Sequence, residues 1–390
     1  MGVCGAFRFH SVGQGLFYSG ILNQRNKNSR KTFSFVYDCG SESARKFLNE
    51  EISDYKLLIP NVSGKKKLNL LVVSHLHDDH INGLERLLQD MDVDNVVMPY
   101  VNDGLKLLAQ LESDRSDEFL MTFYADPIAW FISKGVRRII LLGSEESDHP
   151  TDAPESRFHR NPETDDLYVD GDILRLEHYE ETTVVYLGNK SKLYLRDFDW
   201  RFVVENLSVE SNKTEQYIKI VEDFKKKKLL SLNQIFKSKL LTTELKHALK
   251  GVFSGGDGIN RTSVVLLHGP EGMAKTGYIA SPQIDIYCEN AVEHGYCETI
   301  LTGDIRLAEG EHLDMFSQKD DKHYFVIQYP HHGADNNIEY FCSLSAERYL
   351  ISYGLTNRYG HPDSSIFKKT LSPIIEVNER LAFDYQIHIE

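Results

Sequence analysis

A single ten-residue segment constrains the fold of this chain most strongly. From Ser74 to Gly83 the sequence is Ser-His-Leu-His-Asp-Asp-His-Ile-Asn-Gly, directly after the apolar run Leu70 to Val73. Alternate residues of an extended segment share a face, so the two histidines of His-Leu-His can bind one ion. Where the chain then turns, the second aspartate and the third histidine can face another ion. The ligand-type residues are His75, His77, Asp79 and His80.

Imidazole and carboxylate ligands suit zinc, and also manganese or iron. A polar loop with solvated histidines is the alternative interpretation, but three histidines and an aspartate within six residues favour a metal site. Apolar spacing predicts strands at Leu68 to Ser74 and Asp94 to Met98, with a helix from about Asn82 to Gln89 between them. This β-α-β unit has its ligands at the strand-to-helix turn, where open α/β sheets place their sites.

The rest of the chain continues the alternation of strands and helices, and we expect one α/β domain over residues 1–390. Two segments interrupt the pattern. Residues 143–166 are polar and proline-rich and are expected to form a loop insertion. Residues 209–252 are mostly helical and Lys-rich, with a break near Ser231, and are expected to form a helical insertion. Between them, separate strands are expected at Thr183 to Tyr186 and Leu193 to Leu195.

Three further polar clusters follow predicted strands in the last third of the chain. They are Thr302-Gly303-Asp304, Pro330-His331-His332-Gly333 and the segment that ends in Gly360-His361-Pro362. Because side chains at the ends of neighbouring strands meet at one edge of a sheet, these clusters can converge with the first one.

The order of these motifs resembles the metallo-β-lactamase superfamily of hydrolases. It is most similar to the metallo-hydrolase domain of ComEC-type DNA-uptake proteins, without that family's membrane segments. The matching motifs include Val12-Gly13-Gln14-Gly15, Asp38-Cys39-Gly40, the His75 cluster, Asn260 with Ser263, Leu301-Thr302-Gly303-Asp304, His331-His332-Gly333 and Asn357-Arg358-Tyr359-Gly360-His361-Pro362. The resemblance implies an αββα sandwich with a one- or two-metal site between the sheets, for zinc or, as the alternative, manganese.

The resemblance also implies a role for each matching residue. His75 and His77 would bind the first metal, Asp79 and His80 the second, Asp304 would bridge them and His331 would complete the second site. Asp38 would orient a ligand from behind. Asp79 would also orient the attacking water, and His332 and His361 would be proton donors or phosphate contacts. For His332 and His361 a purely structural role is the alternative.

Two departures from the family pattern affect the expected site. The usual third histidine of the first metal has no clear match, and the candidates are His149, His159, His247 and His268. Leu16 stands where an acidic residue often follows Gly-Gln-Gly, which leaves no acidic side chain on the first hairpin to support the metals.

Composition narrows the partners, the cysteine chemistry and the location that we expect for the protein. The formal net charge of −14 does not indicate a nucleic-acid binder, although lysines cluster at 65–67 and 225–228. The five cysteines show no CxxC spacing, which argues against a disulfide framework and a thiolate zinc site. No apolar run approaches the roughly 20 residues of a membrane span, and no leader is evident, so a cytoplasmic protein is expected.

Three functional classes are compatible with these features. The first is a metal-dependent phosphodiesterase or nuclease, with the lysines at 225–228 following a phosphate backbone. The second is a hydrolase of a small substrate: a lactone, thioester, cyclic nucleotide or phosphorylcholine-type ester. The third is an accessory module with a structural metal, which binds a protein partner through the helical insertion. Six candidate ligands exceed the four of a closed structural zinc site, which favours the enzymes.

Overall fold

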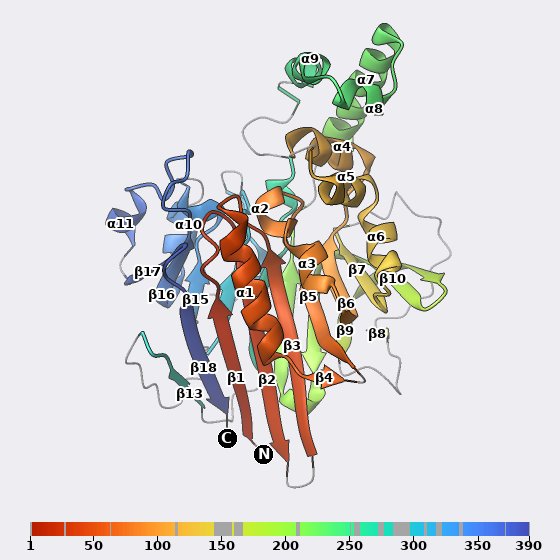
Figure 1. Ribbon diagram of the computed structural model, residues 1–390. Coiled ribbons are helices and arrows are strands. Elements are labelled where there is room, and N and C mark those ends of the chain that lie inside the picture. Colours follow the sequence, from red (N-terminus) through yellow and green to blue (C-terminus); the bar gives the residue numbers. More distant parts are fainter. Residues whose placement is uncertain are drawn as a thin grey trace.

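The computed structural model describes residues 2–26, 29–62, 64–113, 116–143, 158–159, 167–207, 211–249, 251–252, 258–271, 277–283, 297–307, 310–316, 322–334, 338–370 and 372–389. Over these residues the protein is a mixed α/β structure built on one large mixed sheet (Figure 1). In this part of the chain no helix is both long and apolar enough to cross a lipid bilayer.

The first half of the sheet begins with antiparallel strands and becomes parallel around the ligand-bearing strand. Its strands lie in the order β13 (Gly277–Ala280), β18 (Phe383–Ile389), β1 (Gly2–Phe9), β2 (Phe17–Asn26), β3 (Ser29–Cys39), β5 (Lys65–Val72), β6 (Met91–Pro99), β7 (Arg138–Leu142) and β10 (Thr182–Leu195). The pairs from β3 to β10 are parallel, and the short strand β4 (Asn61–Val62) pairs with β5.

Strand β10 connects this half to the second one. Its first residues pair with β7 and its last residues with β11, and β9 (Leu167–Tyr179) runs beside it. The second half continues through β11 (Trp200–Glu205), β12 (Val265–Pro270), β14 (Thr299–Leu301), β15 (His323–Gln328), β16 (Ser345–Ser352) and β17 (Ile374–Val377). The pairs from β14 to β17 are parallel.

The long strand β10 corrects the sequence prediction of two separate strands over these residues. The polar stretch between them, residues 188–192, has the composition of a turn. In the structure Ser191 and Lys192 pair with Gly171 and Asp170 of β9, after an irregularity in register. Pairing with a long neighbouring strand therefore overrides the local turn signal.

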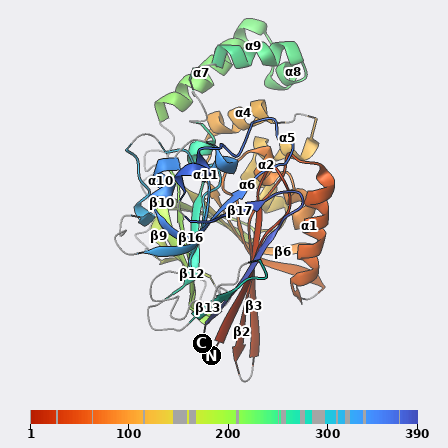
Figure 2. The same cartoon turned by 90° about the vertical axis from the view of Figure 1, so that its left-hand side faces the viewer.

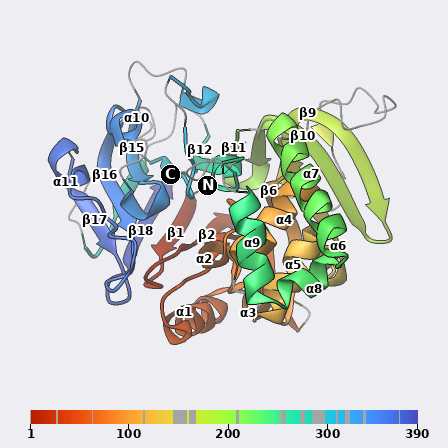
Figure 3. The ribbon, with the colours of Figure 1, turned by 90° about the horizontal axis from the view of Figure 1, so that it is seen from above.

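Three apolar clusters fill the spaces on either side of the strands. The central cluster joins side chains from both halves of the sheet, for example Phe7 of β1, Trp200 of β11 and Phe325 of β15. Another lies under the helices α1 (Arg45–Leu58), α3 (Leu84–Leu88), α4 (Asp103–Glu112), α5 (Glu118–Ala125) and α6 (Pro127–Ser133). The third lies under α10 (Ile338–Cys342) and α11 (Ile366–Lys369), which Figure 3 shows on the opposite side of the strands.

The predicted helical insertion forms three helices, α7 (Ser211–Lys228), α8 (Leu232–Phe236) and α9 (Lys239–Leu249), with the expected break before Leu232 and a second break, which the sequence did not predict, before Lys239. Figure 2 shows them arched over α4 and α5, and α7 contacts α4. Of the predicted loop insertion, Phe158 and His159 form the short strand β8, which pairs with β9. Residues 144–157 and 160–166 lie outside the described residues.

Candidate metal centre

The ligand-rich segment turns sharply as it leaves β5, and neighbouring backbone fixes that turn. The short helix α2 (Asp78–Ile81) starts there, and Gly83 then donates its N–H to the carbonyl of Cys39 at 2.8 Å. This contact lies between α2 and α3, and α3 falls within the helix predicted from about Asn82 to Gln89. A Cβ atom at Gly40 would lie 2.4 Å from the carbonyl carbon of Asp79. Only glycine therefore permits β3 to approach the turn this closely.

The first hairpin supports the same turn through its backbone. The N–H of Leu16 donates to the carbonyl of Asp79 at 3.2 Å, and Ser352 Oγ donates to the carbonyl of Gly15 at 2.8 Å. An acidic side chain at position 16 is therefore not required to hold the ligand turn in place.

Four imidazoles gather at this end of the strands, and each has one nitrogen bound to a group outside the cluster. His80 Nδ1 donates to Asp38 Oδ2 at 2.7 Å, and His332 Nδ1 donates to the carbonyl of Ser352 at 2.9 Å. His75 Nδ1 lies 2.9 Å from Ser74 Oγ, and His77 Nε2 lies 3.2 Å from Glu112 Oε2. These bonds fix the orientation of each ring and leave its other nitrogen for the cluster.

The remaining nitrogens point inward. His75 Nε2 lies 3.1 Å from His77 Nδ1, and His80 Nε2 lies 3.2 Å from Asp304 Oδ1. In the neutral imidazoles both nitrogens of the first pair carry lone pairs, because their partner nitrogens hold the protons. Two ligands of one tetrahedral zinc ion, each at about 2.0–2.1 Å, lie about 3.3 Å apart. The spacing of His75 and His77 therefore suits a shared cation.

Two carboxylates complete the cluster. Asp304 follows β14, and a Cβ atom at the preceding Gly303 would lie 2.7 Å from Ser74 Cβ. Asp304 faces His75 at 3.8 Å and His80 at 3.2 Å, and Asp79 Oδ2 lies 3.0 Å from His332 Nε2. Two groups have the spacing of a metal site: His75, His80 and Asp304; and Asp79, His80 and His332.

Buried polar atoms in this cluster support the same interpretation. His80 Nε2 and Asp304 Oδ1 are buried, and within the described residues neither makes a hydrogen bond of good geometry. Unpaired buried polar groups are costly, and a bound ion is one of the arrangements that satisfies them. The donor set of imidazoles and carboxylates thus fits a zinc or manganese site.

The charged groups of the cluster shift the pKa values of its members in opposite directions. Burial opposes a charge on every member. It lowers the pKa of His75 well below the usual range, with help from the neighbouring His80. For His80 the carboxylates Asp304, Asp79 and Asp38 outweigh burial and raise the pKa well above the usual range. The surrounding imidazoles, His80 first, hold the pKa of Asp304 well below its usual range against burial.

His331 and His361, which the sequence also singles out, lie at the rim of the cluster. His331 Nε2 is 4.0 Å from Asp304 Oδ2, and His331 belongs to neither group of metal-site spacing. Its ring centre lies 5.5 Å from that of His361, and burial lowers the pKa of both. Together with Asp79, Asp304 and His332 they line a cavity of about 230 Å³ over the cluster, which we call the metal cleft.

Of the four candidates for a third histidine of the first metal, the two whose side chains the structure describes do not join the cluster. His268 is buried among aromatic rings, where its Nε2 lies 2.7 Å from Tyr18 Oη, and His247 lies on α9. His149 lies outside the described residues, and of His159 only the backbone is described. The segment that holds Asn260 and Ser263 does lie beside the ligand turn, because Val264 donates to the carbonyl of Ser74 at 2.8 Å.

Sequence analysis did not single out three residues that the structure places behind the ligands. They are Glu112 on α4, which contacts His77, Ser352 at the end of β16, which binds His332, and Tyr124 on α5, which donates to Asp78 at 2.7 Å. No local signal marks them. Asp78, at the start of α2, accordingly has a defined partner.

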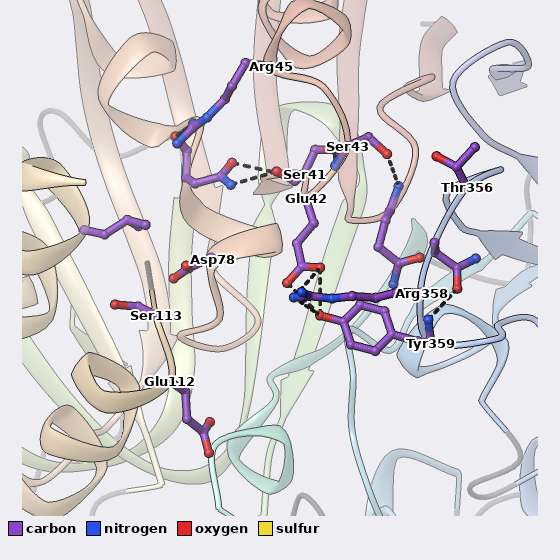
Figure 4. A pocket seen from close by; sticks show the side chains of 14 residues that line it. Ser41, Glu42, Ser43, Arg45, Asp78, Glu112, Ser113, Thr356, Arg358 and Tyr359 are labelled. Atoms are coloured by element: carbon purple, nitrogen blue, oxygen red, sulfur yellow. Dashed lines mark hydrogen bonds and ion pairs between the residues drawn. The ribbon is translucent and has the colours of Figure 1, made fainter. Parts of the chain in front are cut away.

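A second, wider cavity of about 660 Å³ opens beside the metal cleft (Figure 4). It lies between the residues that follow β3, such as Ser41 and Arg45, and the loop around Tyr359. Glu42 and Tyr359 face each other across it, with Tyr359 Oη donating to Glu42 Oε2 at 2.8 Å. Glu42, Tyr359 and Glu112 line both cavities, so the two are adjacent parts of one opening.

No family model matches this chain and no curated protein is significantly similar to it, so the geometry of the site is what indicates its function.

Proposed function

We propose that the protein is a metal-dependent phosphodiesterase with an αββα metallo-β-lactamase architecture. One observation carries the proposal: four imidazoles are each held through one nitrogen by a group outside the cluster and turn the other nitrogen inward, where the buried Asp304 and the half-buried Asp79 lie. The two halves of the sheet with helices on both outer sides support the architecture.

The residues divide into two adjacent ligand sets. His75 and His77 belong to the first, Asp79 and His332 to the second, and Asp304 and His80 lie between the two. Divalent cations held there would lower the pKa of a bound water and neutralise charge on a phosphodiester. Asp79, on the cleft side of the cluster, is placed to orient that water.

The proposal exchanges the expected roles of the two adjacent histidines. Because His332 Nδ1 donates to the Ser352 carbonyl, its Nε2 carries a lone pair in the neutral ring and suits a ligand. His331 and His361 instead face the open cleft, where they are placed to contact phosphate or donate a proton to the leaving group.

Hydrolysis of a small substrate is the second candidate, and the acidic opening favours it. Glu42, Asp78 and Glu112 line the 660 Å³ cavity, and its cations Arg45 and Arg358 face carboxylates of Asp117 and Glu42. A polyanion normally requires cations that are available for its phosphates. Small diesters therefore suit this entrance better than long nucleic acids.

The test is hydrolysis by protein reconstituted with zinc or manganese. The substrates are bis(p-nitrophenyl) phosphate, short and long single- and double-stranded DNA and RNA, and a lactone and a thioester as representatives of the second class. Asp304→Ala is the control, and we expect it to lose bound metal and activity while it remains folded. Cleavage of diesters by wild type alone supports the proposal. Full activity of Asp304→Ala, or cleavage of the lactone or thioester alone, would contradict it.

A further inference from the structure

A separate cavity of about 240 Å³ lies on the other side of His77, between the catalytic body and the helical insertion. Its walls come from α4, α7, α9 and the segment 258–260. Its apolar wall residues are Leu108, Leu111, Leu249 and Ile259, and Tyr217 of α7 adds an aromatic ring. We call this cavity the side pocket.

The side pocket adjoins the metal cleft. His77 and Glu112 line both cavities, so the two cavities adjoin at this pair. A ligand whose phosphate lies at the metal cluster could therefore reach the side pocket with a neighbouring group. At about 240 Å³ the side pocket is smaller than the roughly 300–1,000 Å³ that holds a whole drug-sized ligand. It suits one ring system of a larger molecule.

One buried polar residue of its lining specifies that group further. Asn260 is 4% exposed, and its Oδ1 has no hydrogen-bond partner among the residues that the structure describes. An acyl chain would leave this buried acceptor unpaired, which is unfavourable. A flat heterocycle with an amino group can pack its faces on the leucines and Tyr217 while the amino group donates to Asn260. Aromatic amines of this kind are carried by nucleobases.

We propose that the side pocket binds the nucleobase of a nucleoside phosphodiester, with an amino-substituted base such as adenine preferred. The inference rests on the proposed phosphodiesterase function, and it narrows the substrate class to nucleotides. It also gives the helical insertion a role in substrate recognition, because α7 and α9 supply Tyr217 and Leu249.

Binding to the wild-type, zinc-loaded protein tests the proposal without relying on catalysis. Adenosine 5′-monophosphate and ribose 5-phosphate share the phosphate and sugar and differ in the base. By calorimetry we expect the adenosine compound to bind about tenfold more tightly. Inosine 5′-monophosphate, which has a carbonyl in place of the amino group, should bind more weakly than the adenosine compound. Equal affinities for adenosine 5′-monophosphate and ribose 5-phosphate, or no binding of the former, would overturn the proposal.

Two matched variants of α9 locate the binding. Leu249→Trp fills the side pocket and should remove the preference for the adenosine compound. Leu240→Trp places the same residue on the same helix at a side chain that is 70% exposed, and it should keep the preference. If Leu249→Trp does not fold, the wild-type comparison with ribose 5-phosphate still decides. An unchanged preference in folded Leu249→Trp would overturn the assignment to this pocket.

The outcomes also separate this inference from the proposed function. Hydrolysis of diesters with no preference for a base would refute the side-pocket assignment and leave the phosphodiesterase intact. Base-dependent binding without hydrolysis of any diester would refute the phosphodiesterase and leave a nucleotide-binding site.

Discussion

Replacing Asp38 by asparagine tests how strongly the residues behind the candidate ligands control metal binding at the proposed centre. The Asp38 carboxylate is fully buried and accepts three hydrogen bonds: from Ser74 N–H at 2.7 Å, Ser74 Oγ at 2.6 Å and His80 Nδ1 at 2.7 Å. Its backbone has a φ of +56°, a conformation that asparagine tolerates well. Shape and backbone are therefore preserved, and the charge and one acceptor are lost.

The amide must turn its NH₂ group toward one of these donors. If it faces His80, it donates to Nδ1, and the imidazole proton moves to Nε2, the atom that points at Asp304. A protonated Nε2 cannot bind a metal. Loss of such a supporting partner typically weakens metal affinity about 10–100-fold, which corresponds to about 1.4–2.7 kcal/mol. We expect Asp38→Asn to fall in this range.

Zinc affinity measured by competition with a chromophoric chelator gives the magnitude, and circular dichroism verifies the fold. Asp117→Asn is the matched control. Asp117 also accepts a backbone N–H, from Leu120 at 3.2 Å, but at the start of α5, where asparagine caps a helix as well as aspartate does. Its zinc affinity should stay that of wild type. A folded Asp38→Asn protein with wild-type zinc affinity would refute the reasoning.

Three other changes have defined outcomes. Glu112→Gln should weaken zinc affinity only about tenfold, measured by the same competition, because the Glu112 side chain is 49% exposed and its bond to His77 is longer. Gly40→Ala should cost about 1–3 kcal/mol in urea unfolding, because its methyl group would overlap Asp79. His10 lowers the pKa of Glu51 to about 2, against the effect of burial. The Glu51 carboxylate therefore contributes about 3 kcal/mol to the free energy of unfolding above pH 4.5, and this contribution is lost as the pH falls toward 2. Glu51→Gln should flatten acid unfolding over that interval, and an identical acid profile would contradict the assignment.

The first cluster of candidate ligands could be predicted from the sequence because its geometry is local. His75 and His77 follow a strand at a spacing of two residues, and Asp79 and His80 enter the turn behind them. Asp304 could be predicted to join them because it also follows a strand of the sheet. Residue type and strand ends were sufficient for these positions.

The choice between His331 and His332 could not be made from spacing. Both adopt a φ of +52°, and this left-handed turn directs the second ring, not the first, toward Asp79. The contact of Glu112 with His77 could not be predicted for another reason. It reaches His77 only because α4 packs at this end of the sheet, and nothing in its own neighbourhood along the chain indicates that contact. Tertiary packing decides both cases.

The lysines at 225–228 show how the structure changes the interpretation of a charge pattern. As a run they suggest a track for a phosphate backbone. In the structure Lys225 pairs with Glu222 and Lys228 with Glu244, while the same helices contribute Tyr217 and Leu249 to the side pocket. If the insertion recognised a phosphate backbone by charge, the affinity for an oligonucleotide would fall steeply with salt. The logarithm of the binding constant would fall linearly with the logarithm of the salt concentration, with a slope close to the number of phosphates contacted. If it binds a base, the fall between 50 and 200 mM salt should be shallow, within about tenfold. Measuring KM for a short oligonucleotide across that range distinguishes the two, and a steep dependence would restore the lysine run as the substrate contact.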